Sequence, residues 1–337
     1  PFMEPFSGVL SNLKLRTSWG RAGTDNIGQF QYMSAYGTGG DAVFGGQNPE
    51  IAPGYTETRF PNPNITWETS EMFNIGIDAS FFNGKLNLEA DWFYKKTNDI
   101  LRERTDMPAI LGYKLPAANV GKVDNRGIDL NITHRNHLRD FNYSIAGNLT
   151  WARNKVIDLL EPAGEKNNPR QRSTGHSMSQ YFGYEALGLF QSDEEANNWP
   201  QPQFGKAKAG DIKYKDQNGD GIIDAEDEIA IGRSNYPELV YGLNLNAEWK
   251  GFDITFFFQG AALADFYYNG YLAFPYIEGR GGALLEHHIG NTWTPENPKA
   301  EFPRLYYGGN ANNQLFSSFW MRNGSYLRLK NVEIGYD

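Results

Sequence analysis

Apolar and polar residues alternate with a period of two over long stretches of this chain, and this pattern restricts the fold more than any other feature. Residues 72–82 and 86–95 both alternate in this way, and Asn83-Gly84 between them predicts a two-residue type I′ hairpin turn. The apolar members of the first segment are Phe73, Ile75, Ile77, Ala79 and Phe81. Successive side chains of a β-strand point to opposite faces, so such a strand has one apolar and one polar face. The sequence therefore predicts an all-β fold of antiparallel strands.

The same pairing of alternating segments recurs further along the chain. Residues 128–133 and 143–151 form one pair, and residues 239–249 and 252–259 form another. Several segments exceed the roughly five or six residues usual for strands of a soluble sheet. Aromatic residues stand at the ends of the apolar faces: Trp19, Trp92, Tyr94, Trp151, Trp249 and Tyr336. Such strands, with a polar opposite face, are typical of transmembrane β-barrels, which have aromatic girdles at both lipid interfaces and a wet interior.

The connections between the predicted strands are of two kinds. Tight turns are expected at Asn83-Gly84, near 136–140 and at Lys250-Gly251. Long loops connect the opposite ends, at residues 22–66, 99–125, 155–237 and 260–324. This asymmetry is the pattern of outer-membrane barrels, whose turns face the periplasm and whose loops are extracellular. A soluble β-sandwich also alternates, but it rarely combines such long strands with this asymmetry.

Composition excludes several classes of protein. The 337 residues include no cysteine, which excludes disulfides, thiolate metal sites and a cysteine nucleophile. The formal net charge is −9 and no basic run with interleaved aromatics occurs, which argues against nucleic acid as a partner. The sequence contains no run of about 18 apolar residues, so it contains no candidate for a membrane-spanning helix. Because the sequence contains neither a nucleophile elbow nor a phosphate-binding glycine loop, we do not expect an enzyme.

Residues 216–228 read DQNGDGIIDAEDE and place oxygen donors at the spacing of a calcium-binding loop. The donors in the calcium loop, residues 216–227, are the side chains of Asp216, Asn218, Asp220, Asp224 and Asp227 and the carbonyl of Ile222. Gly221 stands where such a loop turns sharply. The flanking segments 210–214 and 229–232 lack a helical period and are β-like. The sequence predicts a structural Ca²⁺ site between strands; the alternative is an Asp/Gly-rich turn without a metal.

Aromatic residues also gather in the loop 260–324. The candidates for contact with a ligand or a partner protein are Tyr267, Tyr268, Tyr271, Trp293, Tyr306 and Tyr307. Aromatic rings beside Asn, Gln and Arg can stack on sugars or pack on a protein surface. Alternatively, these rings pack the loop on itself, and the sequence leaves both alternatives open.

Several motifs resemble those of one transporter family. They are LKLRTSWG at 13–20, WETS at 67–70, NVGKVDNRGID at 119–129, GDIKY at 210–214 leading into DQNGDGIIDAEDE, YGLN at 241–244, KGFD at 250–253 and RNGSYLRLKNV at 322–332. Together these motifs resemble the C-terminal barrel region of SusC/RagA-type TonB-linked transporters, and the resemblance covers nearly the whole chain.

The resemblance implies an importer of glycans or peptides in the outer membrane of Bacteroidetes. Its implied partners are a SusD-like surface lipoprotein, outer-membrane lipid, and TonB–ExbB–ExbD, which would act through an N-terminal part. Transporters of this class close with roughly 22 strands around a plugged lumen, whereas about ten strands are expected here. The implied architecture is a partial barrel without the plug domain and the TonB-contacting segment.

Two other functions stay open from the residues alone. A secreted, calcium-dependent glycan-binding β-protein would share both the alternation and the calcium loop. A carbohydrate-active enzyme would use paired carboxylates, but no feature of the sequence marks one of them as a general acid. Dependence on detergent for solubility separates the barrel from the secreted binding protein.

Overall fold

The computed structural model describes residues 8–25, 28–46, 49–102, 116–161, 170, 172–277 and 284–337. Parts of all four predicted long loops therefore lie outside the described residues. Within the described chain, the regular structure is almost entirely β-strand. No helix there is long and apolar enough to cross a bilayer.

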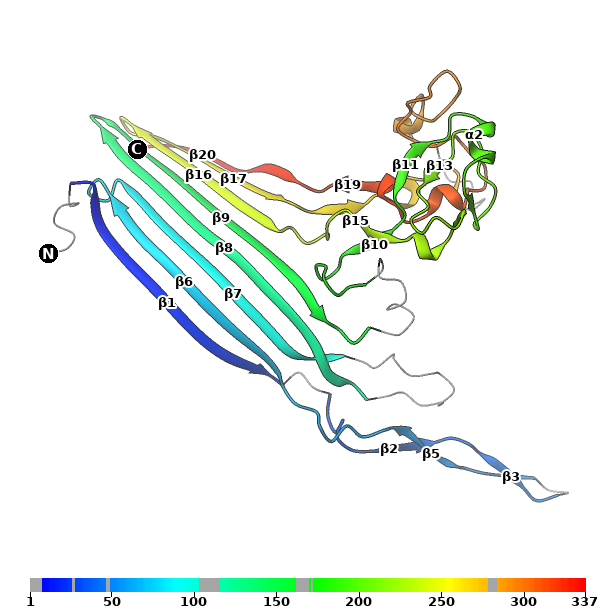
Figure 1. The fold of residues 1–337 in the computed structure, drawn as a ribbon. Helices are drawn as coiled ribbons and strands as arrows, with labels where there is room; N and C mark the ends of the chain where they lie inside the picture. The colour runs from blue at the N-terminus through cyan, green and yellow to red at the C-terminus, as the bar shows by residue number, and fades with distance from the viewer. Residues whose placement is uncertain are drawn as a thin grey trace.

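Eight long strands form one curved antiparallel sheet (Figure 1). In order across the sheet they are β1 (Leu10–Thr24), β6 (Glu68–Phe81), β7 (Leu86–Arg102), β8 (Ala118–Leu138), β9 (Phe141–Asp158), β16 (Leu239–Trp249), β17 (Phe252–Ala262) and β20 (Tyr326–Tyr336). This arrangement confirms the predicted all-β antiparallel fold. The described sheet has eight strands instead of about ten, because the β-like segments 210–214 and 229–232 form short strands outside it.

Three short connections lie at one end of the sheet, which we call the turn end. Trp249 pairs with Phe252 across Lys250 and Gly251, whose φ angles of 47° and 83° fit a two-residue type I′ turn. Glycine favours the second of these positions because it adopts positive φ without strain. Residues 139–140 likewise make a two-residue connection between β8 and β9.

The turn predicted at Asn83-Gly84 is wider than expected. Strand pairing ends at Phe81 and Leu86, so residues 82–85 form a four-residue connection. Phe82, Asn83 and Gly84 all have positive φ, at 53°, 57° and 82°. The prediction of a two-residue turn was wrong because Phe82 also enters the left-handed region.

The strands extend further toward the opposite end, the loop end, than the sequence predicts. β7, β8 and β9 contain 17, 21 and 18 residues, so residues 99–102, 118–125 and 155–158 belong to strands and not to loops. β17 likewise continues to Ala262. These segments continue the strands, but their outward-pointing positions carry charged residues in place of apolar ones. The apolar–polar alternation therefore ends there, and the sequence reads as the start of a loop.

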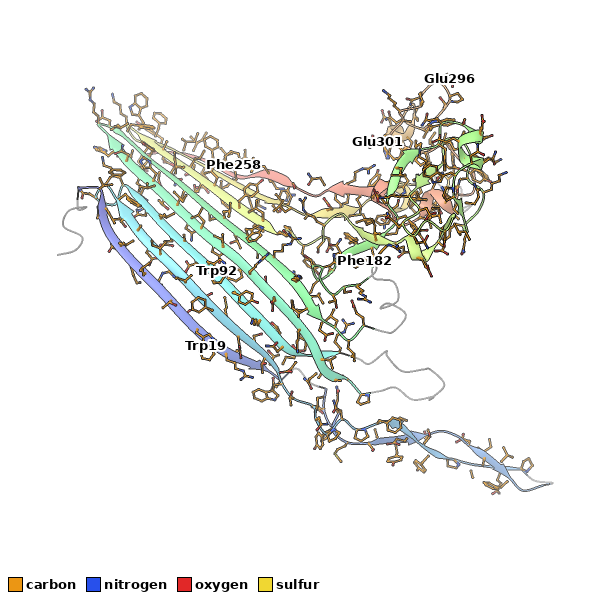
Figure 2. The ribbon with its side chains drawn as sticks, viewed as in Figure 1. Trp19, Trp92, Phe182, Phe258, Glu296 and Glu301 are labelled. Carbon is orange, nitrogen blue, oxygen red and sulfur yellow. The ribbon has the colours of Figure 1, made fainter. Side chains whose placement is uncertain are left out.

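The register places apolar side chains on one face of the sheet, the outer face. Ile128, Trp92 and Ile75 are consecutive cross-strand partners on β8, β7 and β6. On β1 and β20, the two edge strands of the sheet, these side chains are exposed: Leu15 and Ile334 are each 73% exposed. Trp19 and Trp92 lie on this face of β1 and β7 (Figure 2). A monomeric soluble protein rarely exposes so large an apolar surface, so the outer face requires an apolar environment.

The opposite, inner face of the sheet is polar. Arg16 donates from Nη2 to Asp78 at 2.6 Å and to Asp91 at 2.8 Å across β1, β6 and β7. Further along, Thr255 donates to Asn246 at 2.7 Å between β17 and β16. Cross-strand bonds of this kind satisfy polar groups on the sheet surface, which suits a face that lines a wet interior.

The remaining elements belong to the long connections. After β1, a slender hairpin pairs β2 (Ala35–Thr38) with β5 (Tyr55–Arg59) and β3 (Ala42–Phe44) with β4 (Glu50–Ala52), and it projects beyond the loop end (Figure 1). The connection after β9 contains β10 (Tyr181–Gly183), β11 (Ala186–Leu189), α2 (Asp193–Asn197), β12 (Gln201–Pro202), β13 (Ile212–Tyr214), β14 (Ile222–Ile223), η3 (Ala225–Asp227) and β15 (Ile229–Ile231). The connection after β17 contains β18 (Asp265–Tyr267), η4 (Gly270–Leu272), η6 (Glu286–His288), η7 (Asn312–Gln314), η8 (Ser318–Trp320) and β19 (Met321–Asn323).

The two faces predict different responses to charge on β16. Leu245 pairs with Ile145 and Phe256 on the outer face, whereas Asn244 lies on the inner face. Leu245→Arg in the full-length protein should destabilise the membrane-inserted form by about 2–4 kcal/mol, because arginine is costly at the bilayer midplane. Asn244→Arg should be mild. Denaturant unfolding in lipid vesicles measures both, and equal costs would contradict the assignment of the faces.

Candidate functional site

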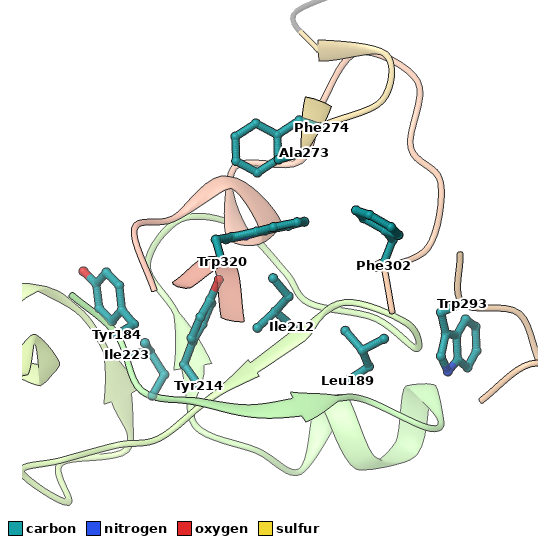
Figure 3. Close-up of a cluster of buried hydrophobic side chains, with 10 residues drawn as sticks. All are labelled: Tyr184, Leu189, Ile212, Tyr214, Ile223, Ala273, Phe274, Trp293, Phe302 and Trp320. Atoms are coloured by element: carbon teal, nitrogen blue, oxygen red, sulfur yellow. The ribbon is translucent and has the colours of Figure 1, made fainter. Parts of the chain in front are cut away.

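The connections after β9 and β17 pack together into one body at the loop end, which we call the loop module (described residues 172–238, 263–277 and 284–325). Its hydrophobic core joins both connections (Figure 3). The buried members are Tyr184, Leu189, Ile212, Tyr214, Ile223, Ala273, Phe274, Trp293, Phe302 and Trp320. The two long loops are therefore a folded unit and not two independent segments.

A buried carboxylate, Asp211, lies between the two halves of the loop module. Its side chain is 0% exposed, and Arg304 donates to it from Nε at 2.8 Å. The side-chain amides of Asn313 and Asn310 donate to the same oxygen at 2.9 and 3.0 Å, and the Lys208 N–H donates to the other at 2.8 Å. A buried charge needs this degree of pairing, because desolvation without partners is costly. Asp211 thus connects the loop after β9 to the loop after β17.

Burial determines the protonation of two tyrosines in this core. Burial raises the pKa of Tyr214 and of Tyr184 well above the usual range, so both hydroxyls stay protonated at physiological pH. The Tyr214 hydroxyl donates to the Asn312 carbonyl at 2.6 Å. These groups stabilise the fold of the module as neutral hydrogen-bond donors.

The predicted calcium loop lies on the surface of the loop module, between β13 and β15 as expected. Its carboxylates accept backbone N–H groups of the same loop: Asp216 from Gly219 and Gly221, and Asp220 from Ile222. Gly221 has a φ of 85°, and a Cβ there would meet no atom within 4 Å. Glycine is therefore favoured at this position because the backbone is in the left-handed region, and not because a neighbouring group leaves no room for a side chain.

Asp227 occupies the last ligand position and is 0% exposed. Its two oxygens accept the N–H groups of Gln217 at 2.7 Å and Asp224 at 3.0 Å, which close the loop. Asn218 and Asp224 make further bonds within or beside the loop. Among the described residues, no three His, Cys, Asp or Glu side chains are grouped closely enough to hold a metal ion. Carboxylate and amide oxygens are the donor types that suit Ca²⁺. In this structure the carboxylates of the loop accept hydrogen bonds from backbone N–H groups.

The six aromatic candidates divide by burial. Trp293 is 9% exposed in the core, and Tyr267 packs against that core. These two rings pack the loop on itself, which was the alternative to ligand contact. Tyr271, Tyr306 and Tyr307 are exposed, the last at 75%.

Two of the exposed tyrosines, Tyr306 and Tyr307, have a cationic or an aromatic neighbour. The Arg304 guanidinium lies 5.1 Å from the Tyr306 ring centre, and the Tyr307 ring lies 6.0 Å from that of Tyr276. Tyr268 is partly buried, and its hydroxyl donates to the Leu272 carbonyl at 2.6 Å. The Arg322 guanidinium lies 5.5 Å from the Tyr268 ring. Tyr268 also packs against the core, and contact with a ligand or partner at Tyr268, Tyr271, Tyr306 and Tyr307 stays a prediction.

Sequence reasoning missed Asp211, although it stands in the GDIKY motif. A lone Asp between Gly and Ile gives no local signal of burial. Its partners Arg304, Asn310 and Asn313 are about a hundred residues away, with separations of 93, 99 and 102. Only the tertiary structure brings them together.

Comparisons with known proteins agree with one another. Residues 8–337 match the family model described as TonB dependent receptor-like, beta-barrel. TonB-dependent receptor P26 of Formosa agariphila is 32% identical over 342 residues, which are 98% of this chain and 33% of the relative. TonB-dependent receptor SusC of Bacteroides thetaiotaomicron is 26% identical over 342 residues, which are 97% of this chain and 32% of the relative.

Solved structures share the fold. The RagAB peptide transporter structure superposes with a TM-score of 0.72 at 24% identity, covering 98% of this chain and 35% of the transporter chain. A structure of the RagAB peptide importer in the open-open state also gives 0.72, at 23% identity, with 98% and 34% covered. The chain spans about a third of the length of these relatives.

Asp211→Ala should loosen the loop module while leaving the sheet intact. The change removes the carboxylate with which Arg304 pairs. Removing one partner of a buried ion pair lowers the free energy of unfolding by about 3–5 kcal/mol. Limited proteolysis of the full-length protein should cut the module faster. Lys215→Ala is the control, because its pair with Glu185 at 3.1 Å is exposed and should cost at most about 1 kcal/mol. Equal cleavage rates would contradict the role of Asp211.

We expect His288 to make the loop module less stable in mild acid. Burial, and secondly His287, lowers its pKa below the usual 6.5. Its Nδ1 accepts the Leu285 N–H at 3.3 Å and its Nε2 lies 3.1 Å from the Leu272 carbonyl, so the folded state holds the neutral ring. The unfolded state binds the proton first, so stability is complete above pH 6.5 and falls below it.

The loss should be at most about 1.4 kcal/mol per pH unit until the folded pKa is reached. The protection factor of the Leu285 amide should therefore fall between pH 7 and pH 5, so that its hydrogen exchange slows less than intrinsic chemistry alone would slow it. Exposed His137 is the control, and His137→Gln should leave the profile unchanged. An exchange rate that followed only intrinsic chemistry would contradict this prediction.

Proposed function

The chain belongs to the TonB-dependent receptor family, as part of its β-barrel, and from this membership we propose that it serves active import of nutrient oligomers across the outer membrane. The observation that carries the proposal is the eight-stranded sheet, with an exposed apolar outer face and a hydrogen-bonded polar inner face. A lipid-facing band and a wet lumen have these properties in transmembrane barrels. Family membership also favours the barrel over a secreted glycan-binding protein or an enzyme.

The substrate class we propose is an oligomer, either a glycan or a peptide. One structural relative is described as a peptide transporter, which supports the peptide alternative. Exposed tyrosines on the loop module, with neighbouring Asn and Arg side chains, suit stacking on either class. Energy would come from TonB–ExbB–ExbD, acting through a part of the protein outside this chain.

The partner we propose is a SusD-like surface lipoprotein seated on the loop module. This proposal places the loop module outside the cell and the turn end in the periplasm. The module offers Tyr271, Tyr306 and Tyr307 as large exposed rings. Tyrosine is enriched at protein interfaces because one rigid ring supplies much contact area and a polar tip.

We also propose that the calcium loop binds one structural Ca²⁺. The supporting observations are the donor set of Asp216, Asn218, Asp220, Asp224 and Asp227 and the sharp turn at Gly221. The ion would neutralise the carboxylates of a surface loop and fix its conformation before a partner binds.

Photocrosslinking in living cells tests the partner and the orientation together. A crosslinker at Tyr307 of the full-length receptor should capture a surface lipoprotein, because that ring is exposed on the loop module. The matched control is a crosslinker at Lys250, in the turn at the opposite end of the sheet, which should capture none. Lipoprotein crosslinks from Lys250 but not from Tyr307 would reverse the orientation.

Asp220→Ala should abolish calcium binding, because position 5 supplies a direct carboxylate ligand. The change should loosen residues 205–232 and leave the barrel strands intact. Titration calorimetry on the full-length protein measures binding, with Glu194→Ala on α2 as a control that removes a carboxylate outside the loop. An absence of binding to the wild-type protein at millimolar calcium would contradict the proposal.

A further inference from the structure

Charged residues on the outer face of the sheet form an ordered row near the loop end. Cross-strand partners along this row are Arg21, Glu71, Lys96, Asp124 and Lys155, from β1 to β9. Their charges alternate in sign, and Arg21 and Glu71 approach to 3.7 Å. The row belongs to the face that carries Ile128 and Trp92 further down the same strands, so it faces away from the lumen.

The neighbouring row, one step closer to the turn end, departs from this alternation. It reads Trp19, Phe73, Tyr94, Arg126 and Arg153. The two arginines are direct partners in the register, and like charges placed directly opposite each other are destabilising. Arg153 is paired with Glu238 at 3.3 Å, whereas Arg126 has no ion pair to a carboxylate in the described chain. An anion held between the arginines would remove the repulsion.

The height of these residues matches the boundary of a bilayer. Phe141 at the turn end and Trp151 lie on the outer face of β9, ten residues apart. The separation is roughly 34 Å along a strand, and a tilt of about 35–45° reduces it to roughly 25 Å, the height of a barrel's apolar band. Arg153 and Lys155 follow Trp151 on the same face, so they lie just above the hydrocarbon, at the level of lipid headgroups.

A cleft of about 350 Å³ lies at this place, between β7, β8, β9 and residues 175–177. Its lining includes Tyr94, Asp124, Arg126, Arg153 and Lys155. The Tyr94 hydroxyl donates to Asp124 at 2.5 Å, which partly satisfies the acidic group of the cleft. Residues 175–176 are held to β9 by two backbone bonds with Val156, both 2.8 Å long. The cleft is therefore an ordered depression on the outer surface, and its lining contains more cationic than anionic side chains.

We propose that this cleft binds the phosphate group of an outer-leaflet lipid. Arginine guanidinium groups match phosphate in geometry and charge, and Lys155 adds a third cation. The aromatic residues directly below would contact the upper part of the acyl chains. The site anchors a lipid beside the loop module, and it rests on the proposed membrane orientation but not on the substrate or on transport.

Native mass spectrometry of the full-length receptor, purified in mild detergent, tests this site. The wild-type protein should retain phosphate-bearing lipid. R126Q/K155Q leaves the Arg153–Glu238 pair intact and should retain roughly tenfold less, since charge-assisted hydrogen bonds are worth about this factor. The matched control K95Q/R135Q removes two cations from the inner face of the same sheet and should retain as much as the wild type. Equal retention in all three proteins would overturn the proposal.

Two further measurements identify the ligand and test whether lost retention comes from misfolding of the double variant. Delipidated wild-type protein should bind a phosphate-bearing lipid much more tightly than inorganic phosphate; equal affinity would mean a free-anion site and would overturn lipid binding. Lys155→Gln alone, at an exposed position, should fold normally and lose part of the retention. TonB-dependent uptake by the same variants is measured separately. Charge-dependent lipid retention without any uptake would contradict the proposed function and leave this site standing.

Discussion

The antiparallel hydrogen-bond ladder is the constraint on which the rest of the structure depends. A chain in a bilayer must satisfy every backbone N–H and C=O internally, and only helices and closed sheets achieve this. Because the ladder also fixes the side-chain period at two, each strand presents an outer and an inner face. The pairing of Leu245 with Ile145 and Phe256 on one face, and the Arg16–Asp78–Asp91 group on the other, both follow from this single register.

The ladder also explains why the long connections fold as one unit. Antiparallel order brings the ends of β9, β16, β17 and β20 together, so the segments after β9 and β17 start from neighbouring positions. Hydrophobic packing around Trp320 and the bonds of Asp211 then join segments that are about a hundred residues apart in the chain. A partner at this surface would meet a preformed module, which lowers the ordering cost of binding.

The alternation predicted the strands, the turn end and the apolar side chains of the outer face, because these depend on local periodicity. It did not predict how far β7, β8 and β9 extend, because charged residues such as Lys96 and Lys155 replace apolar ones on the outer face above the aromatic girdle. The calcium motif was located by its spacing alone. The burial of Trp293, the pairing of Asp211 and the Arg126–Arg153 juxtaposition arise from contacts between distant segments, which no local pattern encodes.

Site-directed spin labelling along β9 tests the central claim most directly, in the full-length receptor reconstituted in lipid. Labels at successive positions from 142 to 151 should alternate with a period of two. Odd positions should be accessible to oxygen dissolved in the lipid, and even positions to a water-soluble nickel reagent. From residue 153 onward, the outer-face positions should become accessible to the water-soluble reagent as the strand leaves the hydrocarbon. Uniform accessibility to water along the strand, or alternation of the opposite phase, would contradict the assignment of a lipid face and a wet lumen.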